Sequence, residues 1–207
     1  MRKAITRDVA ALAIPPLWAI GAWEARTYGL WGALGVTAVL LATVVLALEG
    51  RAVVGRGRHA RLWPLGIGAG LVMVLGTTAL FGPAVRAFPM LFADVSRLYG
   101  AFGDPGSPSA LLLLPVIVLS EEIVWRGAVQ SALAVRMPWL PAALCGALVY
   151  ALAHAPVGSP ALVLTCLVAG FCWSALRGLT DSLLVTVTAH LVWDFAVLVV
   201  HQLAPPA

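Results

Sequence analysis

Two adjacent glutamates lie inside a long apolar stretch that begins at Leu111. They belong to the segment Ser120-Glu121-Glu122, which Arg126 follows one helical turn later. Glu122 and Arg126 are four residues apart and can pair on one helical face, so an ion pair that only fixes helix packing is one explanation for them. Glu121 points about 100° away and has no partner in its own helix. A carboxylate in such an apolar setting can act as a general base near neutral pH.

Two histidines occur with polar partners at one-turn spacing in other apolar stretches. Tyr150 and His154 are four residues apart, and so are His190 and Asp194. His154 alone would be as consistent with an ordinary residue at a helix end. A carboxylate one turn from an imidazole, however, fixes the tautomer and orientation of the ring, and a structural role does not explain this pair in the middle of a lipid-spanning helix. Ionisable groups at such depth cost ~2.5–3.5 kcal/mol on insertion scales and usually serve a function.

The composition places these groups in a membrane protein. The chain has 207 residues, of which 61% are hydrophobic and 11% are charged, and its mean hydropathy is +0.97. An ordinary soluble domain is about 45–50% apolar and about 25% charged. Lipid must therefore cover part of this surface, and we expect a multi-pass protein of a bacterial inner or plasma membrane whose first partner is the lipid bilayer.

The positive charges also favour a membrane over nucleic acid. The net charge is +4, with basic residues concentrated near the N-terminus and in the segment 49–62. Short basic stretches beside apolar spans follow the positive-inside bias. They do not form the basic surface interleaved with aromatic residues that nucleic-acid binding uses, so no nucleic-acid partner is expected.

The apolar stretches predict an all-α, polytopic transmembrane helical bundle of about seven spans, with the catalytic core in the last four. A crossing helix needs about 20 mostly apolar residues. The first span is the least regular because Pro15 and Pro16 interrupt it. The predicted spans are 9–24, 28–48, 63–82, 110–134, 139–155, 160–176 and 181–203.

The loops between the spans predict the orientation of the chain. The basic segment 49–62 is placed in the cytoplasm, which puts the N-terminus inside and the C-terminus outside. Residues 83–109 are predicted to be a re-entrant or interfacial amphipathic piece followed by a turn-rich loop. The chain divides into N-terminal membrane helices with this interfacial segment, residues 1–107, and a catalytic helical core, residues 108–207, within one integrated membrane domain.

The three polar groups together resemble the CPBP family of CAAX-protease and bacteriocin-processing membrane peptidases, also called Abi or type II CAAX prenyl endopeptidases. The family pattern is Glu-Glu-x-x-x-Arg, then an aromatic residue four before His, then His four before Asn. This sequence is similar over about residues 108–200. It departs from the pattern at Tyr150, where Phe is commoner, and at Asp194, where Asn is commoner. The matching residues are Glu121, Glu122, Arg126, Tyr150, His154, His190 and Asp194.

The resemblance implies an intramembrane endopeptidase that cleaves a peptide bond near the membrane-anchored end, expected to be the C-terminal end, of a protein or peptide substrate. It implies that Glu121 and His154 polarise the attacking water, and that His190 and Asp194 stabilise the oxyanion. Because an ionised carboxylate cannot donate a hydrogen bond, Asp194 must be protonated, orient His190 or bind a metal. Glu122, Arg126 and Tyr150 are implied to support the site.

Other functions remain open at this point. A zinc-dependent version of the same hydrolysis would use His154, His190 and Asp194 as ligands. No cofactor is favoured, because no His-Glu-x-x-His pair preorganises a metal. A proton-coupled transporter would show inverted repeats and broken helices, which the sequence lacks. A non-catalytic membrane partner with a degenerate site is the remaining alternative, and a prenylated substrate is not expected.

Overall fold

The computed structural model describes residues 2–50, 53, 61–104 and 106–206, and these are predominantly helical. Arg51, Arg56 and Arg58 of the predicted cytoplasmic loop lie outside the described residues, as do the side chains near the N-terminus that carry its basic charge. The long helices are α1 (Arg2–Tyr28), α2 (Leu30–Glu49), α3 (Trp63–Ala87), α5 (Pro108–Glu122), α7 (Trp139–His154), α8 (Pro160–Thr180) and α9 (Leu183–Asp194), and the shorter ones are α4 (Met90–Phe102), η3 (Ile123–Val129), α6 (Gln130–Ala134), η4 (Ala155–Val157) and η5 (Phe195–Val200).

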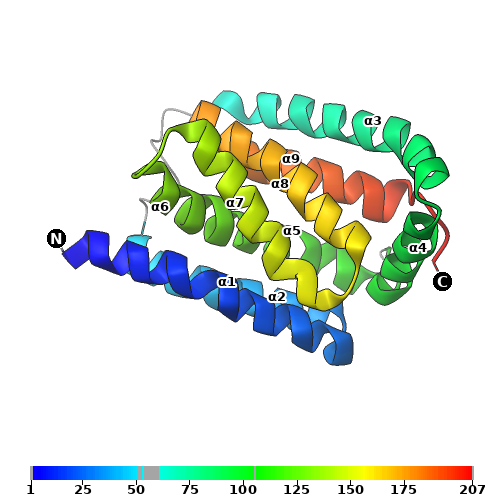
Figure 1. Ribbon diagram of the computed structural model, residues 1–207, viewed down its shortest axis with the longest axis horizontal. Coiled ribbons are helices and arrows are strands. Elements are labelled where there is room, and N and C mark those ends of the chain that lie inside the picture. The colour runs from blue at the N-terminus through cyan, green and yellow to red at the C-terminus, as the bar shows by residue number, and fades with distance from the viewer. Residues whose placement is uncertain (1, 51–52, 54–60, 105, 207) are drawn as a thin grey trace.

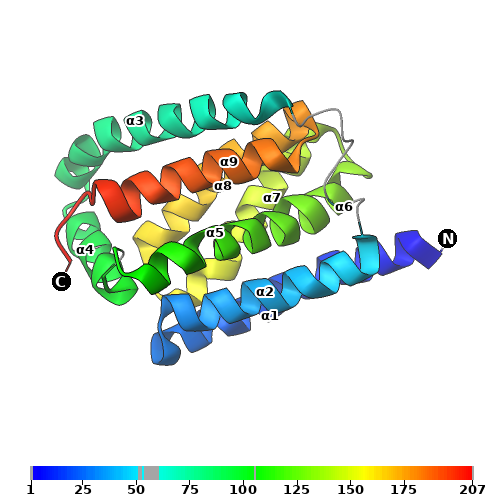
Figure 2. The ribbon, with the colours of Figure 1, turned by 180° about the vertical axis from the view of Figure 1, so that it is seen from behind.

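The long helices form two layers that run along one common direction. In Figure 2 the helices α3, α9, α5 and α2 lie side by side in that order. In Figure 1 the helices α8, α7 and α1 cover the other face of this layer. The motif-bearing helices α5, α7 and α9 are therefore in the interior of the bundle, between α3 on one edge and the α1–α2 pair on the other.

Serine side chains cap the N-termini of three of the long helices, α5, α8 and α9. Ser107, Ser159 and Ser182 are the N-caps of α5, α8 and α9, and each accepts a hydrogen bond from a backbone N–H of the first turn. Proline occupies the first position of α5 and α8, where its missing N–H has no helical partner to lose. These local signals fix where the core helices begin.

Two of the core helices change to π-helical geometry beside the motif residues. Helix α5 ends at Glu122 and continues as the π-helix η3, while α9 ends at Asp194 and continues as the π-helix η5. A π turn widens the helix locally and occurs frequently at functional sites. Helix and motif positions were predicted from the sequence, but this change of geometry was not.

Among the residues that the structure describes, five helical segments are long and apolar enough to cross a membrane. The chain is accordingly an integral membrane protein, but the predicted number of seven spans is not confirmed. The predicted span 9–24 lies inside α1, and the predicted span 110–134 is divided among α5, η3 and α6. The five segments are Leu30–Glu49, Trp63–Ala87, Trp139–Val157, Pro160–Thr180 and Leu183–Val200.

Helix α4 lies at one end of the bundle, near the C-terminus (Figure 1). It corresponds to the predicted interfacial segment. The buried carboxylate of Asp94 fastens it to the start of α8, because Oδ2 accepts hydrogen bonds from Ser159 Oγ at 2.8 Å and from the N–H of Ala161 at 2.7 Å. These contacts fix the position of α4 against the start of α8.

Candidate active site

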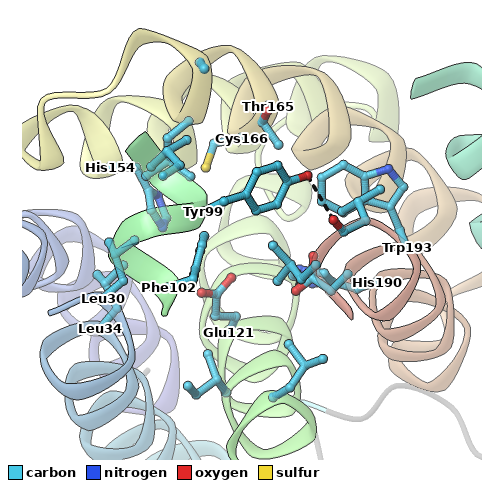
Figure 3. Close-up of a pocket in the computed structure, with 18 of the residues that line it drawn as sticks. Leu30, Leu34, Tyr99, Phe102, Glu121, His154, Thr165, Cys166, His190 and Trp193 are labelled. Atoms are coloured by element: carbon cyan, nitrogen blue, oxygen red, sulfur yellow. Dashed lines mark hydrogen bonds and ion pairs between the residues drawn. The ribbon is translucent and has the colours of Figure 1, made fainter. Parts of the chain in front are cut away.

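A cavity of about 180 Å³ lies between the middle of the bundle and α4. Its walls come from α2, α3, α4, α5, α7, α8, α9 and η5, and most of the lining side chains are apolar. Figure 3 shows Glu121 pointing into the space that Phe102, His154 and His190 surround. Helices distant in the sequence thus bring the predicted site residues to one cavity; those that line it are Glu121, Tyr150, His154, His190 and Asp194.

Glu121 is the glutamate that faces this cavity. Its side chain is largely buried, and its Oε2 accepts a hydrogen bond from the Tyr150 hydroxyl at 2.7 Å. The hydroxyl that distinguishes Tyr150 from the commoner Phe therefore contacts the proposed base directly. A charge-assisted hydrogen bond of this length fixes the direction of the carboxylate.

Glu122, by contrast, is fully buried and does not line the cavity. Its Oε1 lies 3.0 Å from Nη1 of Arg126 and 2.8 Å from Nδ1 of His190. The predicted pair with Arg126 is therefore present, and Glu122 also joins α5 to α9. Arg126 is held in turn by the carbonyl of Gly170 at 3.1 Å and by the ring of Tyr150, whose centroid lies 4.7 Å from its guanidinium carbon.

His190 is held on three sides. Nδ1 contacts Glu122, and Nε2 lies 3.4 Å from Oδ2 of Asp194. The ring stacks on Trp173, with centroids 3.6 Å apart and an interplanar angle of 21°. The predicted one-turn pair of His190 and Asp194 is present, and the ring is fixed with Nε2 on the side of the cavity where Asp194 lies.

His154 has a hydrogen-bond partner at each ring nitrogen. Nδ1 lies 2.8 Å from the carbonyl oxygen of Tyr150, and Nε2 accepts from the indole N–H of Trp18 at 3.0 Å. Sequence analysis assigned His154 to the attacking water, together with Glu121. This geometry leaves neither ring nitrogen free for a water, because both are already engaged by protein groups.

The ligand set of the zinc alternative does not fit this arrangement. Among the described residues, no three His, Cys, Asp or Glu side chains are gathered closely enough to hold a metal ion. Nε2 of His154 accepts a hydrogen bond from Trp18, and Nδ1 of His190 contacts Glu122, so each histidine has a ring nitrogen that is already engaged by a protein group.

Three residues around the site were missed by the sequence analysis. Trp18 bonds to His154, Trp173 stacks on His190, and Gly170 supplies the carbonyl that holds Arg126. Gly170 must be a glycine here, because an added Cβ would lie 2.9 Å from Cδ1 of Tyr150. None of these three residues is ionisable, so a search for ionisable side chains in apolar stretches could not have found them.

Comparison with protein families agrees with this site. Residues 105–196 match the family model described as Type II CAAX prenyl endopeptidase Rce1-like. This part of the chain is therefore similar to Rce1-like endopeptidases. Comparison with curated proteins and with solved structures gave no match.

The matched segment contains all the motif residues but only part of the cavity. It spans α5, η3, α6, α7, α8 and α9, and reaches the start of η5. The opposite wall, with Leu30, Leu34, Tyr99 and Phe102, lies outside the match. The chain is an integral membrane protein whose residues 105–196 match a protease family, and its N-terminal helices complete the cavity that the motif residues line.

Proposed function

We propose that the chain is an intramembrane endopeptidase that hydrolyses a peptide bond near the membrane-anchored end of a protein substrate, using a water activated by Glu121. The observation that carries the proposal is the difference between two neighbouring carboxylates. Glu122 is sealed by Arg126 and His190, whereas Glu121 faces the cavity and has a neutral hydroxyl as its hydrogen-bond partner. Adjacent acids in such different environments take different roles.

In the proposed reaction Glu121 removes a proton from water while the water oxygen attacks the scissile carbonyl carbon. The Tyr150 hydroxyl keeps the carboxylate pointing into the cavity. When the carbon–nitrogen bond breaks, Glu121 returns the proton to the leaving amine, so that one water is consumed for each bond cleaved. A base of this kind commonly contributes about 10²–10⁴-fold to the rate.

We assign stabilisation of the oxyanion to His190 and Asp194. With carboxylates facing both of its nitrogens, His190 can bond on both sides only when both nitrogens carry a proton. The 3.4 Å contact of Nε2 with Asp194 is long for a hydrogen bond, so the Nε2–H of a cationic ring can turn to the developing oxyanion. Losing one such donor commonly costs ~10²–10³ in rate. Asp194 keeps Nε2 of this ring turned toward the cavity.

We also propose that the hydrolysis is metal-free. Among the described residues, no three potential metal-binding side chains are gathered around His154 or His190, which supports this version. The test is elemental analysis of the purified protein beside its activity. Stoichiometric zinc that is lost together with activity would overturn the metal-free version.

The position of the cavity supports a site that opens to the exterior of a bacterial inner membrane. The N-terminus and the α4 end of the bundle lie at opposite ends (Figure 1). The cavity lies toward the α4 end, where α2 begins at Leu30. With the basic N-terminal end in the cytoplasm, substrate reaches the site from outside. A reporter fused to the C-terminus tests this orientation, and cytoplasmic reporter activity would reverse it.

The function is tested by replacing Glu121 and following proteolysis directly. Proteomics of membrane-protein termini compares cells carrying the parent chain with cells carrying Glu121→Gln. In parallel, the purified proteins are given a library of internally quenched peptides, each with an apolar C-terminal anchor. We expect the variant to lose at least ~10²-fold in cleavage rate.

The exposed Glu24 provides the matched control, since Glu24→Gln makes the same chemical change outside the site. Full cleavage by a correctly inserted Glu121→Gln protein would exclude the proposed mechanism. Absence of any terminus that depends on the parent chain would instead favour a transporter or a non-catalytic partner.

A further inference from the structure

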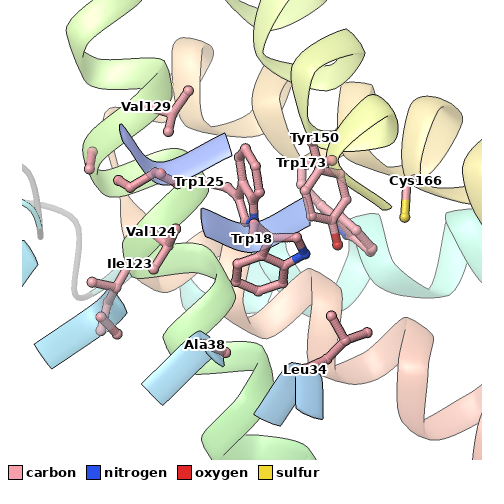
Figure 4. Close-up of a cluster of buried hydrophobic side chains, with 14 of the residues drawn as sticks. Trp18, Leu34, Ala38, Ile123, Val124, Trp125, Val129, Tyr150, Cys166 and Trp173 are labelled. Atoms are coloured by element: carbon pink, nitrogen blue, oxygen red, sulfur yellow. The ribbon is translucent and has the colours of Figure 1, made fainter. Parts of the chain in front are cut away.

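Trp18 belongs to α1, far outside the Rce1-like match, and yet its side chain reaches the site. It is completely buried, and its indole Nε1 donates a hydrogen bond to Nε2 of His154 at 3.0 Å, across 136 positions of the chain. Figure 4 shows Trp18 in the buried cluster beside Trp125 and Tyr150. We propose that Trp18 is a positioning residue of the active site, acting on Glu121 through His154 and Tyr150.

The hydrogen-bond partners of His154 determine the tautomer of its ring. A backbone carbonyl only accepts hydrogen bonds and an indole N–H only donates them. Nδ1 must therefore donate to the carbonyl of Tyr150, and Nε2 must accept from Trp18. Both contacts require the same neutral tautomer, so α1 and α7 together determine which nitrogen carries the proton.

Tyr150 connects the fixed ring of His154 to the proposed base, Glu121. Its backbone carbonyl holds His154 Nδ1, its ring packs edge-on against the imidazole with centroids 4.5 Å apart, and its hydroxyl bonds to Glu121 at 2.7 Å. The contacts thus run without a break from the Trp18 indole to the Glu121 carboxylate. His154 accordingly acts as a link that holds Tyr150, which explains why both of its nitrogens are engaged.

The chain offers a matched control in Trp125. Its side chain packs edge-on against Trp18 with centroids 5.3 Å apart and is almost as deeply buried. Within the described part of the chain, however, its indole nitrogen has no hydrogen-bond partner. Trp125→Phe therefore removes the same atoms from the same cluster as Trp18→Phe, but without breaking a hydrogen bond.

The inference rests on the proposed function, so its test has two arms. In the first, both variants are assayed on the best-cleaved peptide of the anchored library. Trp18 does not line the cavity, so Trp18→Phe is expected to lower kcat about 2–10-fold, the equivalent of one neutral hydrogen bond, at unchanged apparent KM. Trp125→Phe is expected to leave both constants within about twofold of the parent values. Equal losses in the two variants, or a change in KM alone, would overturn the proposal.

The second arm needs no turnover. Nitrogen-15 NMR of histidine-labelled protein in micelles reports the tautomer of His154, whose signals are assigned by their loss in His154→Asn. We expect the neutral Nδ1–H form in the parent and in Trp125→Phe, and a displaced Nε2 resonance in Trp18→Phe. An Nε2–H tautomer in the parent, or identical spectra in all three proteins, would refute the role of Trp18. A fully active Glu121→Gln protein would refute the function while leaving this spectrum unchanged.

Discussion

Gly70 lies where α3 packs closely against α9, the helix that carries His190 and Asp194. A Cβ added at Gly70 would lie 2.7 Å from Cβ of Val192 and 2.8 Å from the carbonyl oxygen of Ala189. Both neighbours belong to the body of a helix and cannot rotate away, so the helices must separate. Such overpacking typically costs about 1–3 kcal/mol.

Gly68 lies two residues earlier on the same helix, and Gly68→Ala is the control that separates the cost of overpacking from the change in helix propensity. A Cβ added there meets nothing within 4 Å. Alanine in place of glycine favours a helix by up to about 1 kcal/mol, and this gain is common to both positions. Gly68→Ala should therefore be neutral or stabilising, while Gly70→Ala should be less stable than Gly68→Ala by about 1–3 kcal/mol.

The comparison is made by equilibrium unfolding of the two purified variants in the same detergent, followed by circular dichroism. Because α3 packs on α9, which carries His190 and Asp194, Gly70→Ala should also lower the cleavage rate when Gly68→Ala does not. Equal unfolding free energies would show that α3 does not pack closely on α9, and the position assigned to that edge of the bundle would be wrong.

Two further predictions concern the charged groups of the site. Asp194→Asn keeps a polar group beside His190 and adds a hydrogen-bond donor. Its loss of cleavage rate should therefore stay well below the ~10²–10³-fold loss expected for Asp194→Leu. Equal losses in the two variants would show that the negative charge of Asp194 is itself needed. Glu122→Gln leaves the buried Arg126 without its ionic partner and should lower the unfolding free energy by about 3–5 kcal/mol. Its control is Arg136→Gln, which breaks an exposed ion pair with Asp8 at a cost of about 1 kcal/mol or less, and the prediction fails if the two variants unfold alike.

Contacts within one helix were predictable because a helix places residues four apart on one face. The pairs of Glu122 with Arg126 and of His190 with Asp194 are both of this kind, and both are present. The apolar stretches likewise gave the all-helical class and most helix positions. The number of crossings was less certain, since α1 and the divided α5 region are not among the segments that qualify by length and composition.

Contacts between helices could not be predicted from spacing. The bond of His190 to Glu122 joins residues 68 positions apart, and that of Trp18 to His154 joins residues 136 positions apart. Neither separation follows a helical period, because the packing of whole helices decides which faces meet. The π-helical geometry after Glu122 and Asp194 also depends on neighbours, since the local sequence there is compatible with an ordinary α-helix.

The sequence by itself therefore determined that acids and histidines lie in apolar helices, and which of them share a face. Tertiary structure decided which glutamate faces the cavity and which is sealed, and it supplied the ring partners Trp18 and Trp173. The physical reason is that burial and hydrogen bonding of a polar group are set by the surfaces packed around it. Those surfaces come from helices that only the folded bundle brings together.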